Sequence, residues 1–114
     1  MLTDLACKLR ASALFTQTGH WNVQGMTFPS DHALLDKIYT TLNEAVDSMA
    51  ERAMGMGESI DGLSPYTQAQ FLAATPECDF TDDNAVFAAI LDMLVELLVD
   101  LSTENFNSVR TIGT

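Results

Sequence analysis

The sequence predicts an all-α protein, an up-and-down helix bundle in which one connection is a long crossover. Apolar residues recur every three or four positions through three long stretches, which is the period of helices with one buried face. Glycines and prolines gather between these stretches, and no stretch shows strand-like alternation. With 114 residues, 47% of them hydrophobic, the chain can build one core, and we expect a single domain over residues 1–114.

The first helix is expected over residues 3–24, with Gly25 placed to stop it. Its apolar positions keep helical spacing: Leu5, Leu9, Ala13 and Phe15 or Thr16. The second helix is expected over about residues 29–56, with Thr27 or Ser30 as its cap and the Gly55 and Gly57 pair at its end. Its apolar side comprises Leu35, Ile38, Tyr39, Leu42, Val46, Met49 and Ala50.

Residues 58–80 predict a crossover that contains a short helix near Tyr66 and Phe71. The third long helix is expected from residue 81 to about 109, with Asp82 and Asp83 as favourable charges at its start. Its expected core face is Phe87, Ile90, Leu91, Leu94, Leu97, Leu98 and Leu101. The predicted order along the chain is therefore two long helices, a short helix and a third long helix.

Three long helices with one crossover resemble an incomplete four-helix bundle. Bundles with a long connection normally bring a fourth helix back to cover the exposed side. We expect the last helix of such a bundle to be missing here. A deleted segment, a naturally short variant and a helix donated by a neighbour all fit the sequence.

Charge and cysteine content exclude several classes of protein. The formal net charge of -11 makes the chain a poor ligand for nucleic acid or anionic membranes, and cations are the more natural partners. Cys7 and Cys78 are too few for a disulfide framework, so we expect the reduced cytoplasm. The longest apolar run, Ala85 to Val99, carries Asp92 and Glu96, which argues against a membrane span.

Four polar residues of the second helix form a stripe. At about 100° per residue, His32, Asp36, Asp47 and Glu51 fall at roughly 0°, 40°, 60° and 100° around the helix axis. His32 and Asp36 are four residues apart, as are Asp47 and Glu51. The two residues of each pair can therefore bind the same metal ion. The two pairs are about 16 Å apart along the axis, which is too far for a common ion.

A second copy of the chain could supply the missing partners. The midpoint of positions 32 and 51 is 41.5, and so is the midpoint of positions 36 and 47. A two-fold axis at this point would place His32 near Glu51, and Asp36 near Asp47, of an antiparallel neighbour, and would create two identical sites. Imidazole and carboxylate ligands without a thiolate favour iron, manganese or zinc, with iron foremost. The alternative is a solvated acidic face that binds no metal.

A second set of acidic residues recurs every four positions along the third long helix: Asp92, Glu96, Asp100 and Glu104. We interpret this ladder as a solvated face. The alternative is the acidic lining of a cavity that concentrates cations.

Three segments carry a resemblance to a known family: His20-Trp21-Asn22-Val23, then Asp31-His32-Ala33-Leu34-Leu35-Asp36, and Asp47-Ser48-Met49-Ala50-Glu51-Arg52. With Phe28 between the first two, they resemble the ferroxidase signature of the Dps family, the mini-ferritins. The match is dense from about residue 5 to 57 and weaker beyond it. In this pattern Trp21 is near the site, although core packing is its more ordinary role, and Asn22 is expected to bond to the helix end.

The resemblance implies a ferritin-like bundle that assembles as a hollow dodecamer, oxidises iron(II) preferably with hydrogen peroxide, and stores iron(III) mineral. It also implies that His20, His32 and Asp36 come from one subunit, and Asp47 and Glu51 from its two-fold partner. The resemblance thus adds His20, from the first helix, to the four proposed ligands of the second helix. The shared midpoint gave the same pairing of subunits independently.

The chain departs from the family in two respects. It starts in its first helix with only Lys8 and Arg10 nearby, so the DNA binding of lysine-rich family members is not carried over. The fourth helix is absent, which leaves closure of a dodecamer open. A rival hypothesis is a non-catalytic helical assembly subunit with a static or vestigial metal site.

Overall fold

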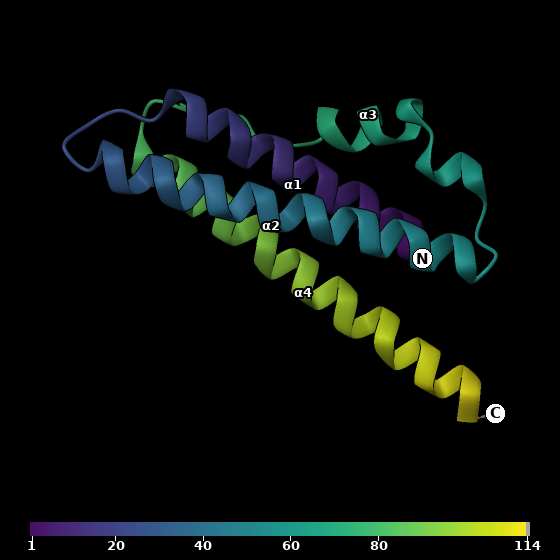
Figure 1. Ribbon diagram of the computed structural model, residues 1–114. Coiled ribbons are helices and arrows are strands. Elements are labelled where there is room, and N and C mark those ends of the chain that lie inside the picture. Colours follow the sequence, from purple (N-terminus) through teal and green to yellow (C-terminus); the bar gives the residue numbers. More distant parts are fainter. Residues whose placement is uncertain (114) are drawn as a thin grey trace.

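The protein consists of three long helices, a short helix and one turn of 3-10 helix (Figure 1). The structure is a computed structural model that describes the backbone of residues 1–113 and the side chains of residues 1–104. The elements are α1 Leu2–Asn22, α2 Phe28–Gly55, η1 Ile60–Leu63, α3 Pro65–Ala73 and α4 Asp83–Gly113. The predicted all-α bundle with a short helix in its crossover is confirmed.

Helices α1 and α2 form an antiparallel hairpin and lie side by side along most of their length (Figure 1). α1 ends at Asn22, slightly before the predicted stop, and the turn is made by Gly25 in the left-handed region at φ 117°. Thr27 occupies the cap position of α2, but its side chain makes no capping hydrogen bond to the helix. The hairpin thereby places the last turn of α1 beside the first turns of α2.

Two apolar clusters hold the helices together. The cluster at the hairpin end comprises Phe15, Val23, Leu35, Val86 and Ile90. The cluster at the opposite end comprises Leu2, Leu5, Ala53 and Leu97. Because each cluster combines residues of α1, α2 and α4, burial of apolar area fixes all three long helices.

The crossover returns the chain to the hairpin end. Ser64 caps α3 by accepting a hydrogen bond from the Thr67 amide at 3.2 Å. The amide of Gln24, in the α1–α2 turn, then donates to the carbonyl of Thr81 at 3.1 Å. Asp82 accepts from the amides of Asn84 and Ala85, which confirms its predicted place at the helix start. α4 is thus attached to the hairpin where the two histidines lie.

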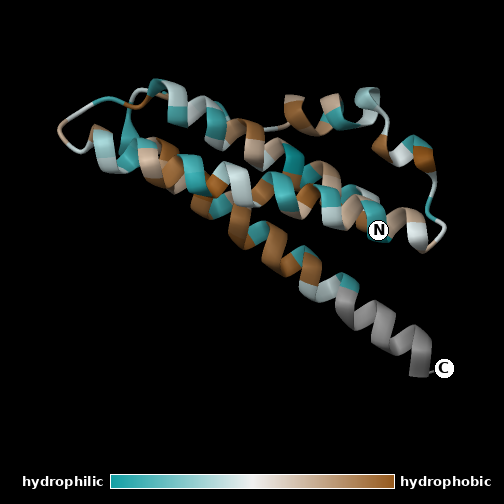
Figure 2. Ribbon diagram, viewed as in Figure 1, coloured by the Kyte–Doolittle hydropathy of each residue, from teal (hydrophilic) through white to brown (hydrophobic). Residues whose placement is uncertain are grey.

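Much of the expected core face of α4 is exposed. Leu91 is 62% exposed, Leu98 64% and Leu101 42%, so the prediction that these residues are buried is wrong. α4 packs mainly against α1 and diverges from α2 toward its C-terminal end (Figure 1). Hydrophobic positions therefore continue along its uncovered side (Figure 2).

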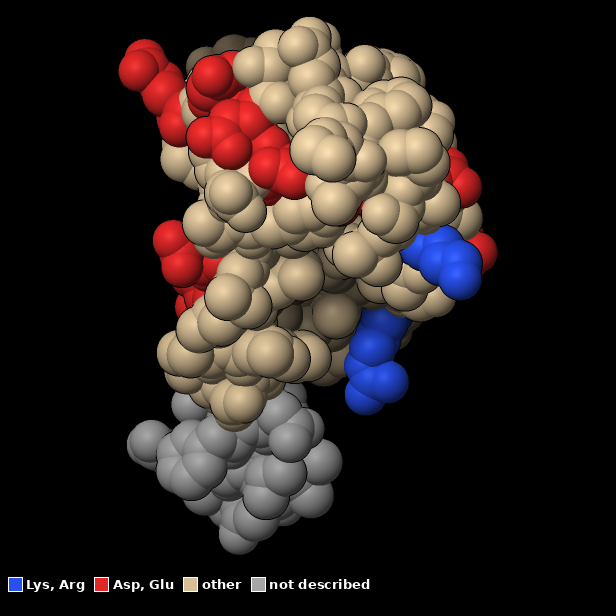
Figure 3. Space-filling model, turned by 90° about the vertical axis from the view of Figure 1, so that its left-hand side faces the viewer, with Lys and Arg blue, Asp and Glu red and all other residues tan. Residues whose placement is uncertain are grey.

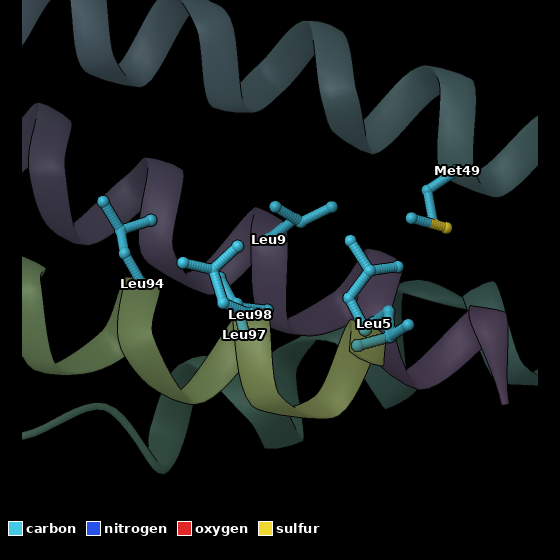
Figure 4. Close-up of a pocket in the computed structure, with 7 residues that line it drawn as sticks. Leu5, Leu9, Met49, Leu94, Leu97 and Leu98 are labelled. Carbon is cyan, nitrogen blue, oxygen red and sulfur yellow. The ribbon is translucent and has the colours of Figure 1, made fainter. Parts of the chain in front are cut away.

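An apolar groove runs beside this uncovered side (Figure 4). It is lined by Leu5, Leu9, Met49, Leu94, Leu97, Leu98 and Leu101. The groove is the open side expected of a bundle with three long helices. No helix in the described part of the chain is long and apolar enough to cross a membrane.

The acidic ladder of α4 is a solvated face in part, since Asp92 and Glu96 are exposed, but some of its carboxylates also lie near cations. Lys8 lies 2.5 Å from Asp100 and 3.8 Å from Glu96. The N-terminal ammonium lies 2.9 Å from Glu104. Three of the four ladder residues thus have a cationic neighbour, and Asp92 alone is left without one among residues 1–104.

Candidate metal centre

The two histidines meet at the hairpin end. His20 lies in the last turn of α1, and His32 lies near the start of α2. Their ring centroids are 3.7 Å apart, and the rings are stacked with an interplanar angle of 17°. The structure therefore brings together two residues that are 12 positions apart in sequence.

Each histidine is hydrogen-bonded to the backbone of the other. His20 Nδ1 lies 2.8 Å from the carbonyl oxygen of His32, and His32 Nδ1 lies 2.8 Å from the carbonyl oxygen of His20. A carbonyl oxygen only accepts, so both Nδ1 atoms must carry the hydrogen. In the neutral rings this leaves both Nε2 lone pairs available to a metal ion.

A glycine next to His20 allows the helices to approach closely at this end. A Cβ atom added to Gly19 would lie 2.7 Å from Val86 Cγ1 of α4. The Gly19 carbonyl also accepts the amide hydrogen of buried Val23 at 2.9 Å, which ends α1. Gly19 thus helps to set the position of His20 relative to α4.

Two aromatic side chains flank the imidazole pair. Phe28 stacks on His32 with centroids 5.1 Å apart, and Tyr39 lies edge-on to His20 at 5.3 Å and 61°. Sequence reasoning assigned Tyr39 only to an apolar helix side. Its spacing of three residues from Asp36 is the signal that could have linked it to the site.

Asp36 is exposed one turn beyond His32 on α2. Hydrogen bonding to the Asp36 carboxylate raises the pKa of the Tyr39 hydroxyl above its ordinary value, and burial adds to this effect. A hydrogen bond with Gln17 of α1 opposes the shift. Asp36 is four positions after His32, so the two residues share one face of α2.

The remaining predicted ligands are not brought to this cluster. Asp47 and Glu51 are exposed on α2, about three turns or more beyond Asp36. Among the side chains that the structure describes, no group of three or more His, Cys, Asp or Glu residues could hold a metal ion. One copy thus brings His20 and His32 together, whereas Asp36, Asp47 and Glu51 are exposed further along α2.

Carboxylates near the hairpin turn add negative charge beside the histidines. The Thr27 hydroxyl lies 2.7 Å from Asp31 Oδ2 and 3.1 Å from Asp83 Oδ2. Figure 3 views the molecule from this end and shows acidic side chains gathered on part of its surface. Their field attracts cations toward this end.

The neighbours of His20 in sequence behave differently from one another. Trp21 is 65% exposed, so its expected packing in the core is wrong. Consecutive helix positions are about 100° apart, and with His20 directed at α2 the next side chain points away from the bundle. Asn22 Nδ2 donates to the Thr18 carbonyl at 2.7 Å, which confirms its expected bond to the helix end.

Comparison with curated proteins gives relatives that cover part of the chain. A DNA protection during starvation protein of Agrobacterium fabrum is 42% identical over 65 residues, which are 56% of this chain and 40% of that protein. DNA protection during starvation protein 2 of Deinococcus radiodurans is 36% identical over 61 residues, 54% of this chain and 25% of that protein. The fine tangled pili major subunit of Haemophilus ducreyi is 36% identical over 56 residues, 49% of this chain and 30% of that protein.

The chain matches less than half the length of each of these relatives. No solved structure matched it significantly. A family model described as the ferritin-like domain matches residues 1–103, which is most of the chain. Together with the bundle of long helices, this match shows that the chain belongs to the ferritin-like domain family, with Dps proteins among its relatives.

Proposed function

We propose that this protein oxidises iron(II) and stores the iron(III) product, at sites shared between two copies of the chain. His20, His32 and Asp36 of one copy, with Asp47 and Glu51 of the other, bind the iron. The observation that carries the proposal is the reciprocal bonding of the histidines, which directs both Nδ1 atoms to carbonyl oxygens and leaves both Nε2 atoms as ligands.

The donor set suits both oxidation states of the substrate. Imidazole nitrogen binds iron(II), and carboxylate oxygen favours the harder iron(III), so a mixed set promotes the loss of an electron. Hydrogen peroxide is the oxidant we propose, because two iron(II) ions and two protons reduce one peroxide to two water molecules. Two iron(III) ions result, and no hydroxyl radical is released.

The two-fold arrangement follows from the position of the ligands on α2. With the axis near position 41.5, an antiparallel copy brings its Asp47 and Glu51 toward Asp36 and His32. All three carboxylates are exposed and available to a second copy. By its resemblance to the Dps family, we infer that such dimers assemble further, into a hollow dodecamer in the cytoplasm with the iron mineral inside.

Oxidation kinetics test the proposal. Iron(II) and hydrogen peroxide are mixed with the protein, and the absorbance of iron(III) is followed by stopped flow. We expect fast oxidation that His32→Ala and Asp36→Ala abolish. Asp92→Asn is the matched control, since Asp92 is an exposed aspartate of α4 without an ion pair among residues 1–104. Equal rates in the parent, His32→Ala and Asp36→Ala would overturn the proposal.

The uncovered apolar side of α4 favours a second candidate function, a non-catalytic assembly subunit. The exposed Leu91, Val95 and Leu98 and the adjacent groove suit contact with other chains. The relative from Haemophilus ducreyi is named as a pilus subunit. Solution mass separates the candidates: a particle near twelve copies with iron-oxidising activity favours the first, whereas an inactive small oligomer favours the second.

We propose no role in DNA binding. The net charge of -11 repels phosphate, and four of the five basic residues, Lys8, Arg10, Lys37 and Arg52, are spread over α1 and α2 rather than gathered in one arm. A gel-shift titration at low salt should show no complex with duplex DNA. Tight binding would reverse this part of the proposal.

A further inference from the structure

Arg10 joins three helices near the middle of the hairpin. Its Nη1 atom donates to Asn43 Oδ1 of α2 at 2.9 Å, and its Nε atom donates to Gln68 Oε1 of α3 at 3.4 Å. Both acceptors are neutral side-chain amides, and Arg10 has no ion pair among residues 1–104. The guanidinium is therefore held in place between the helices, while its positive charge lacks a carboxylate partner in the described part of its own copy.

Glu44 is a carboxylate at the next position of α2 after Asn43. Its side chain is exposed, and it forms no ion pair with the other described side chains. At about 100° per residue, with His32 at 0°, Asn43 falls at roughly 20° and Glu44 at roughly 120° around α2. The two residues therefore lie on opposite sides of the stripe of proposed ligands, whose centre is near 50°. Glu44 is on the side away from the Arg10 of its own copy.

The proposed two-fold axis places Glu44 on the opposite side, where α1 of the other copy runs. A rotation by 180° about an axis near position 41.5 exchanges the two sides of the stripe and reverses the helix direction. Glu44 of the partner subunit then lies level with Tyr39, about 6 Å along the axis from Asn43. The same rotation places Glu51 of the partner subunit beside His32. Both carboxylates thus meet the α1 side of the first copy.

The direction of the side chains favours Glu44 over a cation on the same side. Helical side chains lean toward the N-terminus of their helix. This lean carries Glu44 of the partner subunit toward the level of Arg10, and it carries Lys37 of the partner subunit away from that level. The carboxylate is therefore the nearer charge.

We propose that Arg10 forms a charge pair with Glu44 of the partner subunit, and that this pair holds two copies in the register that the shared metal sites require. The inference rests on the proposed function, because it names a contact within the same interface. Each dimer contains two such pairs. They are needed most before metal binds, because each copy has a net charge of -11 and the exposed carboxylates of the two stripes repel each other.

Charge reversal tests the pair in metal-free protein, by sedimentation velocity over a dilution series. Arg10→Glu and Glu44→Arg each place like charges opposite each other in both pairs. We therefore expect a rise of about 10-fold in the dissociation constant of either variant. Arg52→Glu is the matched control for Arg10→Glu, because Arg52 is exposed about 150° around α2 from the centre of the stripe. Glu77→Arg, at an exposed position of the crossover, is the control for Glu44→Arg, and both controls should match the parent.

A mixture of the two variants shows whether the pair crosses between copies. In a dimer of Arg10→Glu with Glu44→Arg, opposite charges face each other at both pairs, so association should return to near the parental level. If the double variant associates and the mixture does not, the pair lies within one copy and the inference is overturned.

Glu44→Arg also guards against a folding defect, which circular dichroism detects. Arg10→Glu loses its bonds to Asn43 and Gln68, whereas Glu44 is exposed and has no ion pair to lose among residues 1–104. If Arg10→Glu does not fold, the dissociation constant of folded Glu44→Arg decides alone. A parental value for Glu44→Arg overturns the inference.

The proposed function has a separate outcome. If the parent associates and oxidises iron(II) while neither reversal changes the dissociation constant, the inference fails alone. If the parent stays monomeric with and without metal, the shared sites cannot form, and the proposed function fails as well.

Discussion

His20 and His32 are bonded to each other's backbone: each Nδ1 lies 2.8 Å from the carbonyl oxygen of the other residue. The two bonds orient both rings without any metal ion. Each ring is then left with its Nε2 atom as the free ligand. The relation also connects the end of α1 to the start of α2, so the geometry of the hairpin and that of the proposed site depend on each other.

The shared site predicts that two inactive variants restore each other. His32→Ala destroys the site half that carries the histidines, and Glu51→Ala destroys the half that a second copy supplies. In a mixed dimer, one site combines the intact half of each copy. With random pairing of equal amounts, half of the dimers have one working site out of two, so about a quarter of the parental activity should return.

Coexpression of the two variants in equal amounts, followed by stopped-flow oxidation of iron(II) by the purified mixture, measures this recovery. A mixture of His32→Ala with Asp36→Ala is the control, because both changes damage the same half and no pairing restores a site. Recovery in the control, or none in the test mixture, would show that the ligands do not combine across a two-fold axis.

Much of the helical architecture could be predicted from the sequence. Helical periodicity located all three long helices to within a few residues, because Leu35, Leu42 and Val46 repeat on one face of α2 and are indeed buried. The same pattern did not predict correctly which residues of α4 are buried. Leu91 and Leu98 fit the period as well as Ile90 does, but periodicity identifies apolar positions and not which neighbour covers them.

The sequence allowed us to predict candidate ligands for the site, but not the contacts that these residues make. The spacing of His32 and Asp36 gives their common face. The bonds of His20 and His32 to backbone carbonyl oxygens depend on how the turn at Gly25 places two helix ends, and no spacing rule contains that information. Tyr39 was missed as a neighbour of His20 for the same reason. Whether Asp47 and Glu51 join the site stays a prediction.

Gly19→Ala should destabilise the protein and disturb His20. Alanine improves helix propensity by about 1 kcal/mol, but its Cβ would lie 2.7 Å from Val86 Cγ1. Overpacking of this kind costs about 1–3 kcal/mol, and the branched valine has little freedom to move away. We expect a lower midpoint of thermal unfolding, followed by circular dichroism, and weaker cobalt(II) binding.

Gly55→Ala is the matched control, because Gly55 ends α2 with no atom within 4 Å of an added Cβ. Its unfolding midpoint should stay the same or rise slightly. The double variant Gly19→Ala, Val86→Ala removes the clashing methyl groups and should recover part of the cobalt(II) affinity. An unchanged midpoint for Gly19→Ala alone would contradict the close packing of α1 and α4.

Glu58 should stabilise the start of α1 in a pH-dependent manner. Its two carboxylate oxygens accept the amide hydrogens of Leu2 at 3.1 Å and Thr3 at 3.0 Å. Burial raises the pKa of Glu58, but these hydrogen bonds and that of the Thr3 hydroxyl together lower it below the ordinary 4.5. A lowered pKa in the folded state means that the carboxylate contributes stability above pH 4.5, and that this contribution is lost as the pH falls through the folded pKa.

Glu58→Gln tests this contribution, because an amide NH₂ would face one of the two N–H donors. We expect a loss of about 0.5–2 kcal/mol at neutral pH, as for other helix caps, and convergence with the parent in acid. Urea unfolding at several pH values gives both results. Glu77→Gln, an exposed residue of the crossover, should match the parent throughout. A constant difference between Glu58→Gln and the parent at every pH would contradict the role of the charge.

Lys8 should offset the repulsion within the acidic ladder of α4. It lies 2.5 Å from Asp100 and 3.8 Å from Glu96, and the hydrogen bond to Asp100 raises the pKa of Lys8. Lys8→Met removes both interactions while it keeps a long apolar side chain. Because the lysine and Asp100 side chains are each 33% exposed, solvent screens the pair, and we expect a loss of only about 0.2–1 kcal/mol.

Salt separates this electrostatic effect from a loss of packing. Added sodium chloride screens exposed charges, so the difference in unfolding free energy between Lys8→Met and the parent should shrink as the salt concentration rises. Lys37→Met is the control, since Lys37 is exposed on α2 and has no ion pair among residues 1–104. If the unfolding free energy of Lys8→Met stays below that of the parent at high salt, Lys8 acts through the packing of its alkyl chain between α1 and α4. The acidic ladder would then be stabilised by solvent rather than by Lys8.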